Sequence, residues 1–319
     1  MVGSTSLSAE QAEARGKFIG SSEVSCLFGV GRKSAFELWF EKTGRLQAEE
    51  LDEEYIEAGI FLEKAIAKWA AHRNGWTVQK VRRHIAHKTV DGWGASLDYE
   101  IVGHEHGPAP LEVKNVAWFM ATPGKGGAFN WLVDSEAMEA PPAVELQLQH
   151  QIGARGTTWG AIAANIGGNK LRCIARDRDA TIQQQIADKI GWFWGLVKAD
   201  TAPEPDLGRD LDTLRRLFPE ASPGKVVDMT GDADVRQFVR DIKIGRQYAT
   251  AGTDLAEAAM TALLWRIRDA EAVLLGDCFG DGKQWQVVAK TQKRKGYIVQ
   301  DGFSRPVRIA EVKEEKEKK

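Results

Sequence analysis

Three residues with chemically useful side chains lie near one another in the sequence: Asp98, Glu112 and Lys114. Alternate residues of a β-strand project from the same face, so a strand over 111–117 points Glu112 and Lys114 to one side. A hairpin connection then brings Asp98 beside them. Two carboxylates suit Mg²⁺, which prefers oxygen ligands, and a bound cation lowers the pKa of its water. The expected ligands are Asp98, Glu112 and the Val113 carbonyl, with Lys114 orienting the water. The competing interpretation is a surface ladder of ion pairs, which many ordinary hairpins carry.

A third carboxylate, that of Glu63, lies on a helix expected over residues 53–74 and interrupted near Gly59. Its neighbours on the helix are mainly apolar, a setting in which a solvated glutamate is less expected. Glu63 is therefore a candidate to complete the metal site. The alternative is a surface glutamate paired with Lys64 or Lys68.

An amide side chain, Gln147, lies on a helix expected over residues 142–154. Residues three or four apart share a helix face, so Gln147 lies beside either His150 or Gln151. An amide there can hold the nucleophilic water or a phosphate oxygen. A polar helix face without a chemical role explains the pattern equally well.

A possible anion site precedes these residues, where Arg15 is followed by Ser21 and Ser22 at the start of a short helix over 23–28. Backbone N–H groups at a helix start, a serine hydroxyl and an arginine together suit a terminal phosphate. The serines can equally be only a helix cap.

The surrounding hydrophobic pattern changes from helical period to strand period near residue 77, and this change predicts an α/β fold. We expect a mixed central sheet of about five strands flanked by helices. The expected strands cover residues 78–85, 96–102, 111–117, 158–166 and 170–176. The expected helices cover residues 23–28, 35–42, 53–74, 142–154 and 180–198.

Linker composition at residues 199–205 divides the chain. We expect a first domain over 1–205 and a C-terminal region over 206–311 that is mainly helical with a small β element. The final residues, 312–319, are almost wholly Lys and Glu and are expected to be disordered.

The composition of the 319 residues excludes several classes of protein. The hydrophobic fraction of 43% fits a globular core. No apolar run approaches the roughly 20 residues that a membrane helix needs, and the N-terminus lacks the pattern of a secretory signal. Three scattered cysteines are expected to be reduced and mostly buried, which favours the cytoplasm of a bacterium or a phage-infected host. The net charge of −2 argues against a uniformly basic protein that wraps nucleic acid. Lys and Arg nevertheless cluster at 80–84 and 290–308.

Several other histidine, cysteine and aromatic residues give weaker indications of function. His104 and His106 are expected to be spare surface histidines, because no third ligand lies at useful spacing. Three cysteines are too few for an iron–sulfur cluster, which needs four ligands, and no phosphate-binding loop for ATP occurs. Trp118 and Phe119 can either stack on unpaired bases or pack in the core, and core packing is the default.

Five pieces of the sequence, in this order, resemble the YqaJ-type viral recombinase family, a lambda-exonuclease-like branch of the PD-(D/E)XK nuclease superfamily. The pieces are RGKFIGSSEVSCLFGVGRKSAFELWFEKTG (15–44), GIFLEKAIAKWAAHRNG (59–75), SLDYEI (96–101), LEVKN (111–115) and VELQLQHQIGARG (144–156). The resemblance covers residues 15–200. The proline that the superfamily places before its first aspartate is absent, since Leu97 stands there. The loop after Asp98 is also longer than in the lambda enzyme.

The resemblance implies a role for each candidate. Asp98, Glu112 and Glu63 would be metal ligands, and Lys114 would be the catalytic lysine. The remaining matches are Gln147, in the catalytic neighbourhood, and Arg15 with Ser22, where the lambda enzyme binds a 5′-phosphate.

The implied activity is Mg²⁺-dependent exonuclease digestion of linear double-stranded DNA, with Mn²⁺ as a substitute ion. The implied polarity is 5′-to-3′, leaving a 3′ single strand for a single-strand annealing protein. A ring-shaped homotrimer is implied as well. The alternatives are an endonuclease of the same superfamily and a non-catalytic DNA-binding adaptor.

Overall fold

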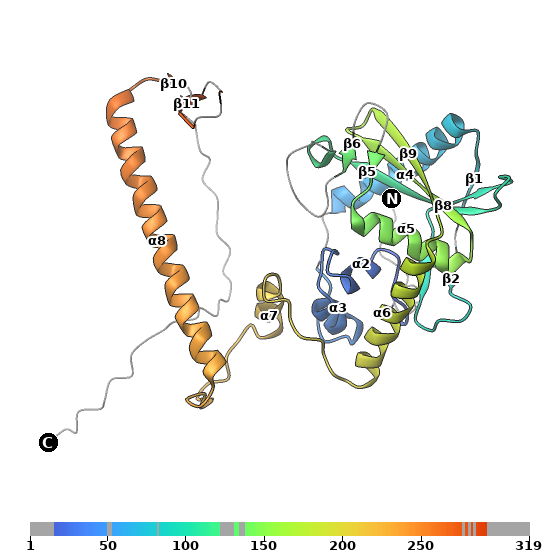
Figure 1. Cartoon of the computed structure of the whole chain (residues 1–319), viewed down its shortest axis with the longest axis horizontal. Coiled ribbons are helices and arrows are strands. Elements are labelled where there is room, and N and C mark those ends of the chain that lie inside the picture. The colour runs from blue at the N-terminus through green and yellow to red at the C-terminus, as the bar shows by residue number, and fades with distance from the viewer. Residues whose placement is uncertain are drawn as a thin grey trace, which may run out of the picture. The chain divides into compact units, whose positions relative to one another are not determined.

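The computed structural model of the chain describes residues 16–49, 53–81, 83–121, 131–133, 138–275, 278–279, 282 and 285–291. The chain forms two compact units, residues 1–217 and 218–319, and each is described by itself (Figure 1). The helices of the first unit are α2 (Val24–Leu27), α3 (Ala35–Lys42), α4 (Glu53–Asn74), the 3₁₀ turn η1 (Trp118–Ala121), α5 (Pro142–Arg155), α6 (Ala180–Lys198) and α7 (Leu211–Leu217). Its strands are β1 (Thr77–Lys80), β2 (His84–Ala86), β3 (Gly94–Ser96), β4 (Tyr99–Val102), β5 (Ala109–Val116), β6 (Leu132–Val133), β7 (Met138–Glu139), β8 (Trp159–Ile166) and β9 (Lys170–Asp177).

A five-stranded sheet in the order β1-β4-β5-β8-β9 forms the centre of the first unit. The pair β5 and β8 is parallel, and the other three pairs are antiparallel. All eight residues of β8 are buried, as expected for a strand covered on both faces. The predicted mixed sheet flanked by helices is confirmed.

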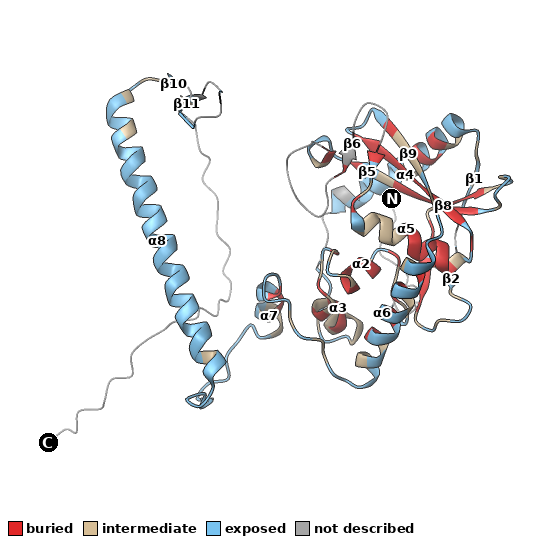
Figure 2. Cartoon of the chain, in the orientation of Figure 1, coloured by how far each residue is buried: buried red, intermediate tan, exposed pale blue. Residues whose placement is uncertain are grey.

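Helices cover the two faces of this sheet (Figures 1 and 2). On one face, Ile66, Ala67 and Ala70 of α4 pack against Leu111 and Val113 of β5. The three α4 residues recur at helical spacing, so a single stripe of the helix meets the sheet. On the other face, α5 packs its apolar residues against the alternate residues of β8: Leu148 and Ile152 against Ile162 and Ala164.

Beyond α5, a separate core contains α2, α3 and α6 around the fully buried Trp93 and Phe193. Gly153 of α5 faces Trp93 so closely that an added Cβ would lie 2.4 Å from the indole ring. The glycine therefore lets α5 contact this core on one side and the sheet on the other.

The second unit contains the 35-residue helix α8 (Ala233–Ile267) and the antiparallel pair of β10 (Ala272–Leu275) and β11 (Trp285–Val288). No residue of α8 is buried (Figure 2). The expectation of a mainly helical region with a small β element is confirmed. The predicted disordered tail, 312–319, lies outside the described residues.

Three predicted elements differ from the structure. Helix α4 continues through Gly59 without a break, because glycine keeps its N–H for the helical hydrogen bonds and only lowers helix propensity. The strand expected over 78–85 is two strands, since β1 pairs with β4 and β2 pairs with β3. The strand expected over 96–102 is likewise divided into β3 and β4, with Asp98 in the bend between them.

The first unit extends to Leu217, beyond the boundary expected after residue 205. Helix α7 is attached to α3, because Arg216 forms an ion pair with Glu37 at 3.1 Å. The Thr213 hydroxyl also donates a hydrogen bond to Glu37 at 3.3 Å.

Two expectations about the chain as a whole concern membranes and cysteines. Among the residues that the structure describes, none of the helices combines the length and apolarity needed to cross a bilayer. The three cysteines are free, with Cys26 buried, Cys173 partly buried and Cys278 exposed. The expectation of mostly buried thiols therefore holds for Cys26 but not for Cys278.

Candidate active site

The candidate site lies on the face of the sheet that α5 covers, at the N-terminal end of β4. In the antiparallel pairing of β4 with β5, Tyr99 lies opposite Leu111. One further step in this register places Asp98 opposite Glu112. Residues that face each other across a strand pair have Cβ atoms about 4.5–5.5 Å apart, so the two carboxylates are neighbours.

Glu112 is the centre of a hydrogen-bonded group. Its Oε1 lies 2.6 Å from the Lys114 ammonium and accepts a hydrogen bond from the Gln147 amide at 2.8 Å. Its Oε2 accepts from the Gln151 amide at 2.5 Å. Lys114 also donates to the Gln147 carbonyl oxygen at 3.0 Å. Because the Glu112 side chain is almost fully buried, these donors offset the cost of removing its charge from water.

The Asp98 carboxylate points toward β5, where it accepts a hydrogen bond from the Val113 backbone N–H at 2.9 Å. Burial and the negative charges of Glu112 and Glu63 together raise the pKa of Asp98 to about 8. The Val113 hydrogen bond and the positive charge of Lys114 act in the opposite direction. The Asp98 carboxyl thus lies where the charges of neighbouring carboxylates outweigh the positive charge of Lys114.

This shortage of positive charge fits a divalent cation. Asp98 and Glu112 supply the oxygen ligands that Mg²⁺ prefers, and a cation between them would relieve their repulsion. No group of three His, Cys, Asp or Glu side chains within the described ranges is arranged as a metal site. Asp98 and Glu112 fit a cation held between two carboxylates, with its remaining positions open to other ligands.

Glu63 lies at the edge of this group and not inside it. On α4 it precedes the sheet-facing residues Ile66 and Ala67 by three and four positions, so it shares their face. Its carboxylate forms an ion pair with Lys80 of β1, not with the lysines that follow it on its own helix. Its negative charge is one of the causes that raise the pKa of Asp98.

The face of α5 above the site carries three polar residues at helical spacing, Gln147, Gln151 and Arg155. The first two bind Glu112, and Arg155 forms an ion pair with the buried Glu100 at 2.7 Å. The contact of Gln151 with Glu112 is not predicted by the sequence. The four-residue spacing between Gln147 and Gln151 indicates only that both lie on one face of the helix. His150, the other candidate neighbour, turns away and packs against Trp93.

The residues expected to bind a terminal phosphate are only partly described. Arg15 lies outside the described residues. Ser21 is buried and Ser22 is exposed. Neither serine caps α2, because its N-cap residue is Glu23, which makes no side-chain capping hydrogen bond. The Glu23 carboxylate instead accepts from the Gly20 N–H at 2.8 Å and pairs with Lys42. The phosphate site stays a prediction.

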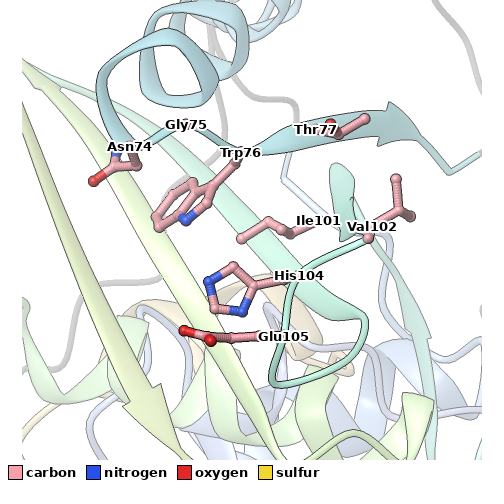
Figure 3. Close-up of a pocket in the computed structure, with 9 residues that line it drawn as sticks. Asn74, Gly75, Trp76, Thr77, Ile101, Val102, His104 and Glu105 are labelled. Atoms are coloured by element: carbon pink, nitrogen blue, oxygen red, sulfur yellow. The ribbon is translucent and has the colours of Figure 1, made fainter.

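A shallow cavity of about 260 Å³ lies far from these groups, at the opposite end of β4 (Figure 3). Its lining includes Trp76, Ile101 and His104. The His104 ring packs against Trp159 with centroids 4.6 Å apart. His104 and His106 are not part of a three-residue metal group in the described chain.

Comparison with known proteins finds a family match over the N-terminal part of the chain. Residues 11–158 match the family model of the YqaJ-like viral recombinase domain. This stretch contains the candidate residues Asp98, Glu112, Lys114 and Gln147. The match confirms the resemblance found in the sequence motifs.

A particular relative is the uncharacterized protein YqaJ of Bacillus subtilis, which is 27% identical over 268 residues, or 82% of this chain and 79% of the relative. The crystal structure of LHK-Exo in complex with dAMP aligns with a TM-score of 0.44 at 19% identity, covering 64% of this chain and 94% of that one. The alkaline exonuclease LHK-Exo from Laribacter hongkongensis aligns with a TM-score of 0.43 at 19% identity, covering 60% and 93%. At this level of similarity, the two structures say nothing about the activity of this chain.

Proposed function

We propose that the protein is a metal-dependent nuclease that hydrolyses phosphodiester bonds of double-stranded DNA. The observation that carries the proposal is the convergence of Asp98, Glu112 and Lys114 on one face of the sheet. Two acidic groups that need a cation, next to a lysine, suit the hydrolysis of a charged phosphate ester. The family match supports a role in recombination, for which DNA is the substrate.

In this proposal, each residue has a distinct role. Asp98 and Glu112 hold Mg²⁺, with Mn²⁺ as a substitute, and the Val113 carbonyl and Glu63 complete the ligand set. When bound, the cation would supply an activated water and neutralise charge on the scissile phosphate. Lys114 orients that water, and Gln147 positions both Lys114 and Glu112 through its two hydrogen bonds.

We further propose that the enzyme acts from DNA ends in the 5′-to-3′ direction. Arg15, Ser21 and Ser22 would anchor the 5′-phosphate, which places the next phosphodiester over the carboxylates. The 3′ single strand left behind would be the substrate of a single-strand annealing protein. A homotrimeric ring is part of the same proposal. These points are supported by the family resemblance alone.

Digestion of linear and relaxed circular DNA with Mg²⁺ tests the activity. We expect release of nucleotides from the linear duplex and no nicking of the circle. Linear DNA carrying a label at its 5′ or 3′ ends would give the polarity, and removal of the 5′-phosphate should slow the reaction. Nicking of the circle would identify an endonuclease of the same superfamily.

Glu112→Gln is the diagnostic variant, because it keeps the shape of the side chain while removing the charge. Glu145→Gln is the matched control, since Glu145 is also an ion-paired glutamate, bound to Arg176 at 2.9 Å outside the site. We expect the first variant to lose at least about 100-fold in rate and the second to cleave like the wild type. Equal cleavage by the two variants would contradict the role of Glu112. Absence of nucleotide release from the wild type in Mg²⁺ would favour a non-catalytic adaptor.

A further inference from the structure

Two aromatic side chains immediately after the catalytic strand are turned toward solvent. Trp118 is 56% exposed and Phe119 is 66% exposed, so the default expectation that they pack in the core is wrong. Both lie in η1, which begins two residues after β5 ends. Large aromatic rings are costly to leave exposed to water, so two of them next to the proposed catalytic strand suggest a ligand.

Trp118 is held in place by the turn between β8 and β9. A Cβ added to Gly167 would lie 3.2 Å from the indole ring, so the ring lies directly against this turn. Gly167 also donates its N–H to the Val116 carbonyl at 2.8 Å. The Lys170 ammonium lies 4.7 Å from the centroid of the indole, in a cation–π contact.

The same aromatic pair lies close to the proposed catalytic lysine. Trp118 follows Lys114 by four residues, which is at most about 13 Å of extended chain. Lys114 is opposite Ala164 on β8, and Ala164 is opposite Arg172 on β9. Cross-strand neighbours share a face of the sheet, so Arg172 lies on the catalytic face, about 10 Å across two strands from Lys114.

Lys170 lies on this face as well, because it is two residues from Arg172 on β9. Positive charge therefore continues from Lys114 through Arg172 to Lys170, which lies on the ring of Trp118. Aromatic rings next to a track of positive charge are the arrangement by which proteins bind single-stranded nucleic acid: bases stack on the rings, and phosphates contact the cations.

We propose that Trp118 and Phe119, with Lys170, form a stacking site for unpaired bases of DNA next to the catalytic centre. The substrate class is then a DNA end with a few unpaired nucleotides, not a fully paired duplex alone. Lys170 contacts the phosphate beside the base stacked on Trp118. This inference rests on the proposed function for its DNA substrate, but its test does not require cleavage.

Binding of an oligothymidylate by the full-length protein in EDTA tests the stacking site, because a chelator prevents metal-dependent cleavage. The variants are Trp118→Ala, Trp118→Phe and Phe119→Ala. Trp192→Ala is the matched control, since Trp192 is 43% exposed and carries a lysine, Lys189, 5.4 Å from its ring. Trp118→Ala and Trp192→Ala each remove an exposed tryptophan that contacts a lysine, but only Trp118 lies near β5.

We expect Trp118→Ala to raise the Kd for the oligonucleotide about tenfold and Trp118→Phe to restore most of the affinity. Phe119→Ala should weaken binding in the same direction, and Trp192→Ala should have no effect. Equal affinities for Trp118→Ala and the wild type would overturn the inference, and so would an equal loss in Trp192→Ala. Thermal unfolding of each variant shows whether it is folded.

The two proposals fail in different ways. A protein that binds the oligonucleotide through Trp118 but leaves linear duplex intact in Mg²⁺ supports the stacking site and contradicts the nuclease. A protein that digests the duplex but binds the oligonucleotide equally well without Trp118 supports the nuclease and contradicts the stacking site.

Discussion

At the scale of residues, the site depends on how the Glu112 charge is neutralised inside the fold. Lys114, Gln147 and Gln151 together occupy both oxygens of this carboxylate. Groups that orient a metal ligand without contacting the metal commonly matter for activity almost as much as the ligand itself. In the proposed metal site Gln151 would be such a positioning residue, because it binds Oε2 while Lys114 and Gln147 bind Oε1.

Gln151→Ala should therefore lower the cleavage rate about 10- to 100-fold while the protein remains folded. The measurement is nucleotide release per folded molecule at saturating Mg²⁺. Gln149→Ala is the control, since Gln149 is an equally buried glutamine of α5 that instead binds the Asp177 carbonyl. It should lose stability but not rate. A Gln151 variant that cleaves as fast as the control would exclude the positioning role.

The buried His150 should make the first unit sensitive to acid. Burial lowers the pKa of His150 from 6.5 to about 3, so the native protein keeps it neutral where the unfolded chain binds a proton. Stability from this residue is complete above about pH 6.5 and is lost as the pH falls toward 3, by about 1.4 kcal/mol per pH unit. Urea unfolding from pH 7 to pH 4.5 should show a steeper loss for the wild type than for His150→Leu. Parallel curves would contradict this account.

At the scale of elements, α5 connects the sheet to the second core of the first unit. It packs against β5 and β8 on one side and against Trp93 on the other. Gly153 is at the closest point of that second contact. Its position shows how a residue that is unfavourable in a helix can be required by packing.

Gly153→Ala should destabilise the first unit by about 1–3 kcal/mol, because the added methyl overlaps the rigid indole of Trp93. Gly191→Ala is the control on α6, where an added Cβ meets nothing within 4 Å. There the better helix propensity of alanine should stabilise the protein by up to about 1 kcal/mol. Chemical denaturation measures both. Stabilisation by both substitutions would show that α5 is not constrained by Trp93.

Several elements could be predicted closely from the sequence because local signals mark their ends. The expected bounds of α3 and α6 agree with the structure, in which the N-caps Ser34 and Asp179 accept backbone hydrogen bonds. The division of the strands near Val81 and Asp98 was not predicted. It depends on which strands pair in space, and hydrophobic alternation alone does not contain that information.

The candidate site could likewise be predicted only in part from the sequence. Strand alternation placed Glu112 and Lys114 on one face, as the structure has them. The contact of Gln151 with Glu112 and the pairing of Glu63 with Lys80 depend on how α5 and α4 lie on the sheet. Such contacts between elements far apart in sequence cannot be derived from spacing within one helix.

At the scale of the whole molecule, the two units differ in how they bury their residues. The first has three clusters of buried apolar residues, whereas α8 in the second buries none. A unit with its own core is expected to fold independently. The candidate active site lies entirely within the first unit.

A chain ending at Leu217 should therefore fold and retain digestion of linear DNA within about tenfold of the full-length rate. A chain ending at residue 205 should be less stable, because it lacks the contacts of Arg216 and Thr213 with Glu37. Thermal unfolding and nucleotide release compare the two. Equal stability of both truncated chains would place the boundary at 205 after all.

The dependence of duplex digestion on a divalent ion tests the central claim most directly. Nucleotide release from linear duplex is measured with EDTA, after Mg²⁺ is restored, and for folded Asp98→Asn in Mg²⁺. We predict that release stops in EDTA, returns with Mg²⁺ and falls at least about 100-fold in the variant. Continued digestion in EDTA, or an Asp98→Asn protein as fast as the wild type, would contradict the account.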